Sequence, residues 1–298
     1  MSYQFYTCDV FTNTRFGGNP LAVLVDSSGL TGEQMGLIAR EFNYSECTFL
    51  LPAEQGHTAR VRIFARLKEF PFAGHPNVGT AFVMATLGML GKFEEETSIV
   101  FEELAGPVPI TVRRQADGSF WCELKAPQSL SLGKTVSAER MATILSISPD
   151  EIVTDVHLPQ FASVGLPYFI TELKSKAVLE KINVNLDALR ALSAESERDS
   201  LYVYTHSQDE FDIRCRMFAP LSGTFEDPAT GSANCALAGL LAHYHPSADG
   251  TFNWHIAQGV EMGRPSVLDA RAEKAGGDVT GVWIAGESVM VSQGTIEV

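Results

Sequence analysis

Two segments of this sequence, about half a chain apart, end in residues that can bind and move charge. Residues 60–76 read RVRIFARLKEFPFAGHP, and residues 214–232 read RCRMFAPLSGTFEDPATGS. Each segment ends in small residues immediately before an apolar stretch that is long enough for a helix. A helix start carries unpaired N–H groups and a partial positive charge, so each segment predicts a site for an anion. The doubling favours a small substrate that bears a carboxylate.

The two copies differ in the side chains that could do chemistry. The first copy ends in Gly74-His75-Pro76, whereas the second carries Asp227 and ends in Gly231-Ser232. A purely structural repeat has no need of these unlike side chains, which makes them candidate functional residues. A structural interpretation stays open for each, because Asp227 can cap a helix, Ser232 can bond a backbone N–H, and the histidine can be a buried structural residue.

Glu46 is a further candidate because it stands at the entry of an apolar strand, within residues 43–49, NYSECTF. On position alone, a solvated strand end is the simpler interpretation. Glu69 and Glu226, in the Glu-x-Pro of each copy, are expected to be structural because both copies retain them. We expect the arginines of the repeat to serve the sheet faces in the same way.

The elements that must position these residues follow one order in both halves. The first half predicts, in order, strands at Gln4–Phe11 and Leu21–Val25, an amphipathic helix at Thr31–Phe42 with Thr31 as N-cap, strands at Cys47–Leu51 and Ala59–Ala65, and an apolar helix at 77–90. The second half predicts strands and helices at Tyr168–Thr171, Leu186–Leu192, Leu201–Tyr204, Ile213–Ala219 and Ala233–Ala242. The shared order indicates an internal duplication.

The duplication predicts an α+β protein of two pseudo-symmetric halves. The seam is expected near residues 115–125, and strand-like segments at Val289–Val291 and Thr295–Val298 are expected to close the sheet of the first half. We therefore predict a first lobe of residues 1–118 plus 282–298 and a second lobe of residues 119–281. Under a pseudo-two-fold relation, both helix starts would face a cleft between the lobes, which is a favoured place for a ligand.

Composition excludes several classes of function. The chain has 36 acidic and 22 basic residues and a formal net charge of −14, which disfavours nucleic acid as a partner. Its five cysteines are scattered and predict reduced, buried thiols rather than a zinc site or a disulfide framework. No apolar run reaches the length of a membrane span, and the first residues lack the layout of a secretory signal, so we expect a cytoplasmic protein. Motifs for nucleotides, for zinc proteases and for nucleophilic hydrolases are missing.

Five motifs together resemble the PhzF-like, phenazine-biosynthesis family. They are GNPLAV at 18–23, SECTF at 45–49, FAGHP at 72–76, EDPATGSA at 226–233 and QGVEMGRP at 258–265. The resemblance covers essentially the whole chain. It implies a fold similar to that of diaminopimelate epimerase, in which each half wraps a curved, mostly antiparallel sheet or barrel around a central apolar helix.

The resemblance implies an isomerase that needs no cofactor and no metal. Such an enzyme moves a proton within a small carboxylate-bearing metabolite, similar to trans-2,3-dihydro-3-hydroxyanthranilate isomerase. The implied catalytic residues are Glu46, His75 and Asp227, with Glu46 as the group that moves the proton. The implied substrate-binding residues are Asn19, Gly74, Thr230, Gly231 and Ser232. A homodimer is also implied.

Other members of the fold use different chemistry at the same places. Diaminopimelate epimerase and proline racemase place one cysteine at each helix start, whereas the matching positions here are Ala73 and either Pro228 or Ala229. Cys235 lies about two turns further on and is expected in the core. Carboxylate chemistry is therefore favoured over a pair of thiols. Burial in a closed cleft would raise the pKa of Glu46 toward the working range of a general base.

The substrate stays open because the chain departs from the family pattern. Residues 64–71 read FARLKEFP, and a proline follows Asp227 where the phenazine enzyme has an alanine. A second class of function also stays open, a non-catalytic protein that binds or carries a small metabolite in the same cleft. Turnover separates the two interpretations.

Overall fold

The computed structural model describes residues 1–196 and 198–298, which divide into two units. The first unit is Met1–Pro127 with Ala285–Val298, and the second is Gln128–Ile284. These boundaries differ from the expected lobes of 1–118 plus 282–298 and 119–281. The main difference arises because strand β8 (Phe120–Lys125) pairs antiparallel with β7 (Gly106–Arg114), which keeps β8 in the first unit.

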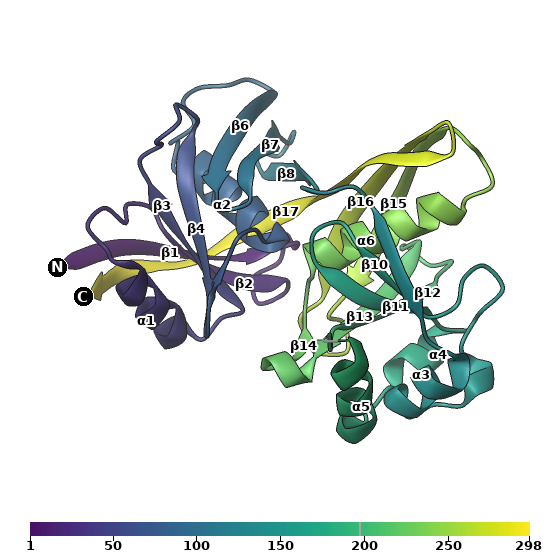
Figure 1. Ribbon diagram of the computed structural model, residues 1–298. Helices are drawn as coiled ribbons and strands as arrows, with labels where there is room; N and C mark the ends of the chain where they lie inside the picture. Colours follow the sequence, from purple (N-terminus) through teal and green to yellow (C-terminus); the bar gives the residue numbers. More distant parts are fainter. Residues whose placement is uncertain (197) are drawn as a thin grey trace. The chain divides into compact units, whose positions relative to one another are not determined.

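Strand pairing closes the first unit into a barrel of eight strands, whose strands can be followed in Figure 1. Neighbouring strands pair in the order β1, β2, β3, β4, β6, β7, β8 and β17, and β17 returns to β1. The bounds of its remaining elements are β1 Ser2–Val10, β2 Asn19–Leu24, α1 Gly32–Phe42, β3 Glu46–Leu51, β4 Ala59–Ala65, β5 Glu69–Phe70, α2 Gly74–Thr86 and β6 Glu96–Glu103. Helix α2 contacts β1, β2, β3, β7 and β8, and every residue from Gly74 to Ala85 is buried, so α2 fills the barrel.

The last strand, β17 (Asp278–Glu297), passes from the second unit into the first. Its later part pairs antiparallel with β1, from Ser2 opposite Glu297 to Val10 opposite Ser288. The expected closure of the first sheet by the tail is therefore confirmed. One strand of 20 residues replaces the two short strands that the sequence predicted.

The second unit has the same plan around helix α6 (Gly231–Tyr244). Its strands pair in the order β9, β10, β11, β12, β13, β15 and β16. The bounds are β9 Ser131–Thr135, α3 Ala138–Leu145, β10 Gln160–Ser163, β11 Pro167–Glu172, α4 Lys176–Glu180, α5 Leu186–Ser196, β12 Leu201–His206, β13 Ile213–Ala219, β14 Thr224–Asp227, β15 Gly250–Gln258 and β16 Ser266–Ala275, with 3-10 turns at Pro149–Glu151 and Pro220–Ser222. Helix α6 contacts β10, β11, β15 and β16.

Strand pairing confirms the duplication. The parallel pairs β2–β3 and β4–β6 of the first unit correspond to β11–β12 and β13–β15 of the second. The antiparallel pairs β3–β4 and β4–β5 correspond to β12–β13 and β13–β14. Each unit then places its apolar helix after the short strand β5 or β14. The α+β fold of two similar halves is therefore confirmed.

The helix predictions hold with shifted starts. Helix α1 has the expected N-cap, since the Thr31 hydroxyl accepts from Gln34 N at 3.2 Å. Helix α2 was expected at 77–90 but spans Gly74–Thr86, because Pro76 fits the first turn, where a missing N–H costs nothing. Helix α6 likewise begins at Gly231, two residues before the expected start. Across residues 1–196 and 198–298, none of the helices combines the length and apolar character of a membrane span.

The repeated arginines and glutamates are structural, as predicted. Arg62 Nε and Glu69 Oε1 lie 2.7 Å apart, and Arg216 Nε and Glu226 Oε1 lie 2.8 Å apart; both pairs are bidentate. The pair in the second unit is the more buried, with side-chain exposures of 9% and 10% against 21% and 22% in the first. Each pair joins the two paired strands that precede a central helix, β4 with β5 and β13 with β14.

We predict that Glu226→Ala destabilises the protein more than Glu69→Ala. Removing one partner of a buried ion pair leaves an uncompensated charge, and a loss of about 3 kcal/mol is expected for Glu226→Ala. The more exposed pair should lose about 1 kcal/mol. Urea denaturation of the two variants measures the difference, and equal losses would show that burial does not set the strength of these pairs.

Candidate active site

The two central helices start without a side-chain cap. Their N-cap residues, Ala73 for α2 and Thr230 for α6, make no side-chain hydrogen bond to the first turn, and neither first turn contains an acidic residue. By contrast, the outer helices α1, α3 and α4 are capped by the hydroxyls of Thr31, Ser137 and Ser175. The first-turn N–H groups of α2 and α6 are therefore suited to an external anion.

An asparagine holds each of these helix starts in the same way. Asn77 Nδ2 donates to Ala73 O at 3.0 Å, and Asn234 Nδ2 donates to Thr230 O at 2.9 Å. Both asparagines are fully buried. The sequence analysis missed them, although a signal was present, since an asparagine stands three residues after the glycine in both GHPN and GSAN. The paired bonds fix the backbone at the point where an anion would bind.

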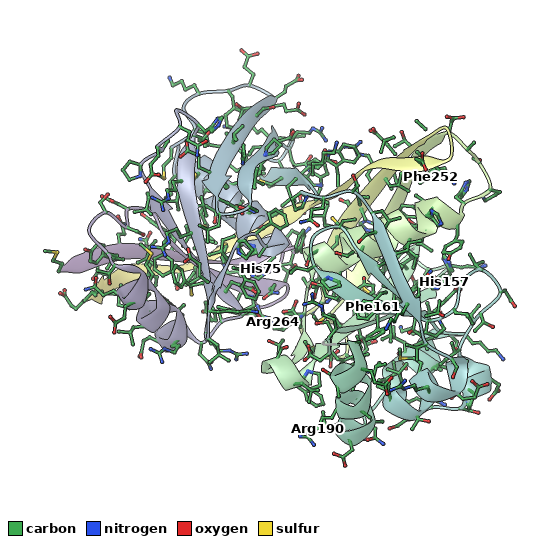
Figure 2. The ribbon with its side chains drawn as sticks, in the orientation of Figure 1. His75, His157, Phe161, Arg190, Phe252 and Arg264 are labelled. Atoms are coloured by element: carbon green, nitrogen blue, oxygen red, sulfur yellow. The ribbon has the colours of Figure 1, made fainter. Side chains whose placement is uncertain are left out.

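Glu46 and His75 lie together in the first unit. Glu46 is the first residue of β3, opposite Leu21 of β2 and Ala65 of β4. His75 lies in the first turn of α2 (labelled in Figure 2). The distance from His75 Nδ1 to Glu46 Oε2 is 3.4 Å, and the two side chains are 6% and 17% exposed. Two residues that the sequence singled out separately therefore form one acid–base pair.

The environment of His75 keeps its ring neutral. Burial lowers the pKa of the His75 imidazole from 6.5 to about 3. Its Nε2 atom is buried and has no hydrogen-bond partner among the described residues. An unpaired buried nitrogen costs free energy unless a ligand supplies its partner. His75 is thus a neutral hydrogen-bonding group and a poor base.

Asn19 and Gly74, two predicted substrate-binding residues, also belong to this part of the first unit. Asn19 is the first residue of β2, pairs with Val10 of β1 and is fully buried. It follows Gly18, whose φ is +59° and where a Cβ would lie 2.3 Å from Val10 O. Only glycine fits this turn, so the turn fixes where Asn19 enters the sheet. Gly74 is the first residue of α2.

Asp227 and Thr230 form the corresponding group in the second unit. Thr230 Oγ1 donates to Asp227 Oδ2 at 2.5 Å, and both residues are buried. The Gln258 side chain forms hydrogen bonds to the backbone of both residues. Its Nε2 donates to Asp227 O at 2.8 Å, and its Oε1 accepts from Thr230 N at 3.1 Å. The QGVEMGRP motif contains Gln258, yet its role was not predicted. These bonds hold the Asp227 carboxylate in one orientation next to the start of α6.

Gly231 and Ser232 are the first two residues of α6. The Ser232 hydroxyl lies 2.7 Å from the Tyr168 hydroxyl, and either can donate. Ser232 is partly exposed, unlike the other polar residues of this turn. Tyr168 on β11 is a further residue that was not predicted, because strand pairing and not local sequence brings it to the helix.

All five cysteines are buried free thiols. Burial raises the pKa of Cys8, Cys47, Cys122 and Cys215 above the ordinary thiol value. Cys235 is also buried, within α6, as expected for a core residue. Within the described residues, no group of three or more His, Cys, Asp or Glu side chains is placed to hold a metal ion.

Comparison with known proteins matches the chain to one family. The family described as phenazine biosynthesis-like protein matches residues 8–294. An uncharacterized isomerase of Mesorhizobium japonicum is 37% identical over 99% of this chain and 98% of its own length. The trans-2,3-dihydro-3-hydroxyanthranilate isomerase of Pseudomonas aeruginosa is 34% identical over 98% of each chain.

Solved structures agree on the fold. A PhzF-family phenazine biosynthesis protein of Bacillus anthracis has a TM-score of 0.90 at 24% identity, with both chains fully covered. A hydroxyproline epimerase of Agrobacterium vitis has a TM-score of 0.66 at 13% identity, covering 99% of this chain and 91% of that one. The chain therefore belongs to the phenazine biosynthesis-like family, and it is an isomerase.

Proposed function

We propose that this isomerase shifts a proton between carbons of a small carboxylate-bearing metabolite, without a cofactor. The observation that carries the proposal is the Glu46–His75 pair, in which a carboxyl group stands 3.4 Å from a buried neutral imidazole at an uncapped helix start. The pair supplies a proton acceptor and a hydrogen-bonding group without any metal ligand.

Glu46 is the proposed base and acid. Its carboxylate takes a proton from a substrate carbon, and the same proton, or one from solvent after exchange, returns to a different carbon. The substrate's charge and composition are unchanged at the end, so the reaction needs no co-reactant. His75 cannot take this part at neutral pH because burial holds its pKa at about 3. Its Nδ1 is instead placed to orient the Glu46 carboxyl, and its buried Nε2 is suited to a substrate hydroxyl or amine.

The second unit is proposed to bind and orient. The Asp227 carboxylate, held by the Thr230 hydroxyl, suits an amino or hydroxyl group of the substrate. The amides of Gly74, Gly231 and Ser232 and the Ser232 hydroxyl suit a carboxylate. Asn19 is proposed to contact the substrate from the start of β2. This division leaves the proton transfer to the first unit.

The names of the relatives indicate a substrate class. The Pseudomonas aeruginosa relative acts on trans-2,3-dihydro-3-hydroxyanthranilate, a cyclic compound with amino, hydroxyl and carboxylate groups. Those groups match the donors and acceptors proposed above. We therefore propose a cyclic, amino- or hydroxy-substituted carboxylate as the substrate here. The departures at residues 64–71 and at Pro228 make the identity of the ring a separate question. The expected homodimer stays a prediction.

We predict that Glu46→Gln removes proton transfer. Incubation of trans-2,3-dihydro-3-hydroxyanthranilate and related cyclic amino acids with the protein in D₂O, followed by NMR, should show deuterium at a substrate carbon. The amide cannot accept a proton, so the rate should fall by roughly 10²–10⁴-fold. Glu41→Gln is the matched control, because Glu41 is an exposed glutamate at the end of α1. Binding without exchange in the wild-type protein would favour a carrier, and full activity of Glu46→Gln would refute the assignment.

We predict that Ser232→Ala weakens substrate binding more than turnover. A hydrogen bond to a charged group contributes about 1.5–3 kcal/mol, so KM should rise roughly 10- to 100-fold while kcat changes less. Ser247→Ala, at an exposed serine after α6, serves as the control. The opposite pattern, with kcat lost and KM unchanged, would assign Ser232 to the chemical step.

We predict that His75 makes the protein less stable in mild acid. Because its folded pKa is about 3 against 6.5 ordinarily, the unfolded chain takes up a proton between these values while the folded chain does not. Stability therefore falls as the pH is lowered from about 6.5. Relative to His75→Asn, the wild type should lose about 1.4 kcal/mol per pH unit between pH 6 and 4. Urea denaturation across this range tests it, and a difference that does not vary with pH would contradict a neutral His75.

A further inference from the structure

Glu103 occupies the position in the first unit that Gln258 occupies in the second. Each is the last residue of its strand, Glu103 in β6 and Gln258 in β15. Ala59 of β4 pairs in parallel with Phe101 of β6, two residues before Glu103. The equivalent pair in the repeat is Ile213 of β13 with Ile256 of β15, two residues before Gln258. The duplicated fold thus places a carboxyl group where the other copy has an amide.

Gln258 uses its amide to hold the start of α6. Its Nε2 donates to Asp227 O at 2.8 Å and to Thr230 Oγ1 at 3.0 Å. Its Oε1 accepts from Thr230 N at 3.1 Å and from Asn234 Nδ2 at 2.9 Å. The site needs a donor as well as an acceptor. An ionised carboxylate can only accept.

Glu103 stands beside the matching asparagine of α2 but lacks such bonds. Both of its carboxyl oxygens are buried without a hydrogen-bond partner among the described residues, and the same holds for Asn77 Oδ1. Burial raises the pKa of Glu103 to about 8, and the Asn77 side chain, which lies near the carboxyl without meeting hydrogen-bond geometry, lowers it by less. Each of these neighbouring oxygen atoms therefore lacks a hydrogen-bond donor. A proton on Glu103 turns one of its oxygens into a donor.

The charged groups on the surrounding elements have other partners. On β4, Arg60 pairs with Glu54, and Arg62 pairs with Glu69. On β6 itself, the carboxylate of the neighbouring Glu102 accepts from the backbone N–H groups of Glu54, Gln55 and His57. On α2, His75 contacts Glu46, and on β7, Arg113 pairs with Glu96. Arg114, also on β7, lies over the rings of Phe93 and Phe120. Among the described residues of these elements, no cation is therefore placed to hold Glu103 as a carboxylate.

We propose that Glu103 carries a proton in the folded protein and stands in for the Gln258 amide, which makes it a positioning residue for the start of α2. Its hydroxyl donates to an acceptor of this turn; Asn77 Oδ1 is one, and by the repeat the carbonyl of Phe70, which corresponds to Asp227, is another. Through Asn77 it fixes Ala73 and the first turn that carries His75. Its effect on catalysis rests on the function proposed above, whereas its protonation does not.

Protonation of Glu103 gives stability a definite dependence on pH. Between pH 4.5 and about 8 the folded chain holds a proton on Glu103 that the unfolded chain has lost, so stability falls as the pH rises through this range. Glu103→Gln keeps the shape and the donor but cannot ionise. The stability of Glu103→Gln relative to wild type should therefore increase as the pH rises, by up to tenfold in the folding equilibrium constant per pH unit.

Urea denaturation of wild type, Glu103→Gln and Glu95→Gln from pH 5 to pH 9 tests the proposal. Glu95→Gln is the matched control, since Glu95 is exposed just before β6. We expect the advantage of Glu103→Gln to grow up to about pH 8 and then level off, while Glu95→Gln follows the wild type. A Glu103→Gln variant that fails to fold, or that is less stable than wild type at pH 7–8, would overturn the proposal.

Deuterium exchange into trans-2,3-dihydro-3-hydroxyanthranilate at pH 7 and pH 9 tests the effect on the site. The wild type should lose activity above pH 8, and Glu103→Gln should retain more of it. If wild type and Glu103→Gln lose the same share of exchange activity at pH 9, Glu103 does not position the site. The denaturation data would still decide whether Glu103 is protonated. If the wild type shows no exchange at all, the proposed function fails, and the denaturation result still decides the state of Glu103.

Discussion

The uncapped first turns of α2 and α6 are the feature on which the rest of the structure depends. A helix that is apolar on every side must be surrounded, and in the first unit a closed barrel of strands does this for α2. The start of α2 then lies where β3 begins and β6 ends, with Glu46 and Glu103 beside it. A side-chain cap would satisfy the N–H groups there. Its absence in both central helices, against its presence in α1, α3 and α4, leaves them for a ligand.

Different residues at equivalent positions give the two central helix starts different chemical groups. The two units share their strand pairings, their buried arginine–glutamate pairs and their helix asparagines. At matched positions they hold different side chains, which are Glu46 and Ser200, Phe70 and Asp227, His75 and Ser232, and Glu103 and Gln258. The first unit thereby gains a carboxyl–imidazole pair and the second gains a fixed aspartate with two hydroxyls.

Local sequence was sufficient to predict features that depend on residues close together in the chain. The N-cap of α1, the structural role of the repeated arginines and glutamates and the burial of Cys235 were predicted from pattern and composition, and the structure agrees. Contacts made by strand pairing were not accessible. β8 belongs to the first unit through its hairpin with β7 and its long-range pairing with β17, and Tyr168 and Gln258 reach α6 from strands that are distant in the sequence. Glu103 could not be predicted for the same reason, because only the strand pairing shows that it occupies the position of Gln258 in the repeat.

The most direct test of the central claim is a ¹⁵N–¹H NMR titration with anthranilate, an aromatic carboxylate that carries an amino group but no proton to shift. If the two central helix starts bind the carboxylate, the amide signals of Gly74, His75, Gly231 and Ser232 should shift in a saturable way. Those of Gly32 and Glu33, at the capped start of α1, should stay in place. Saturable binding that leaves the amides of either central start unmoved would contradict the account.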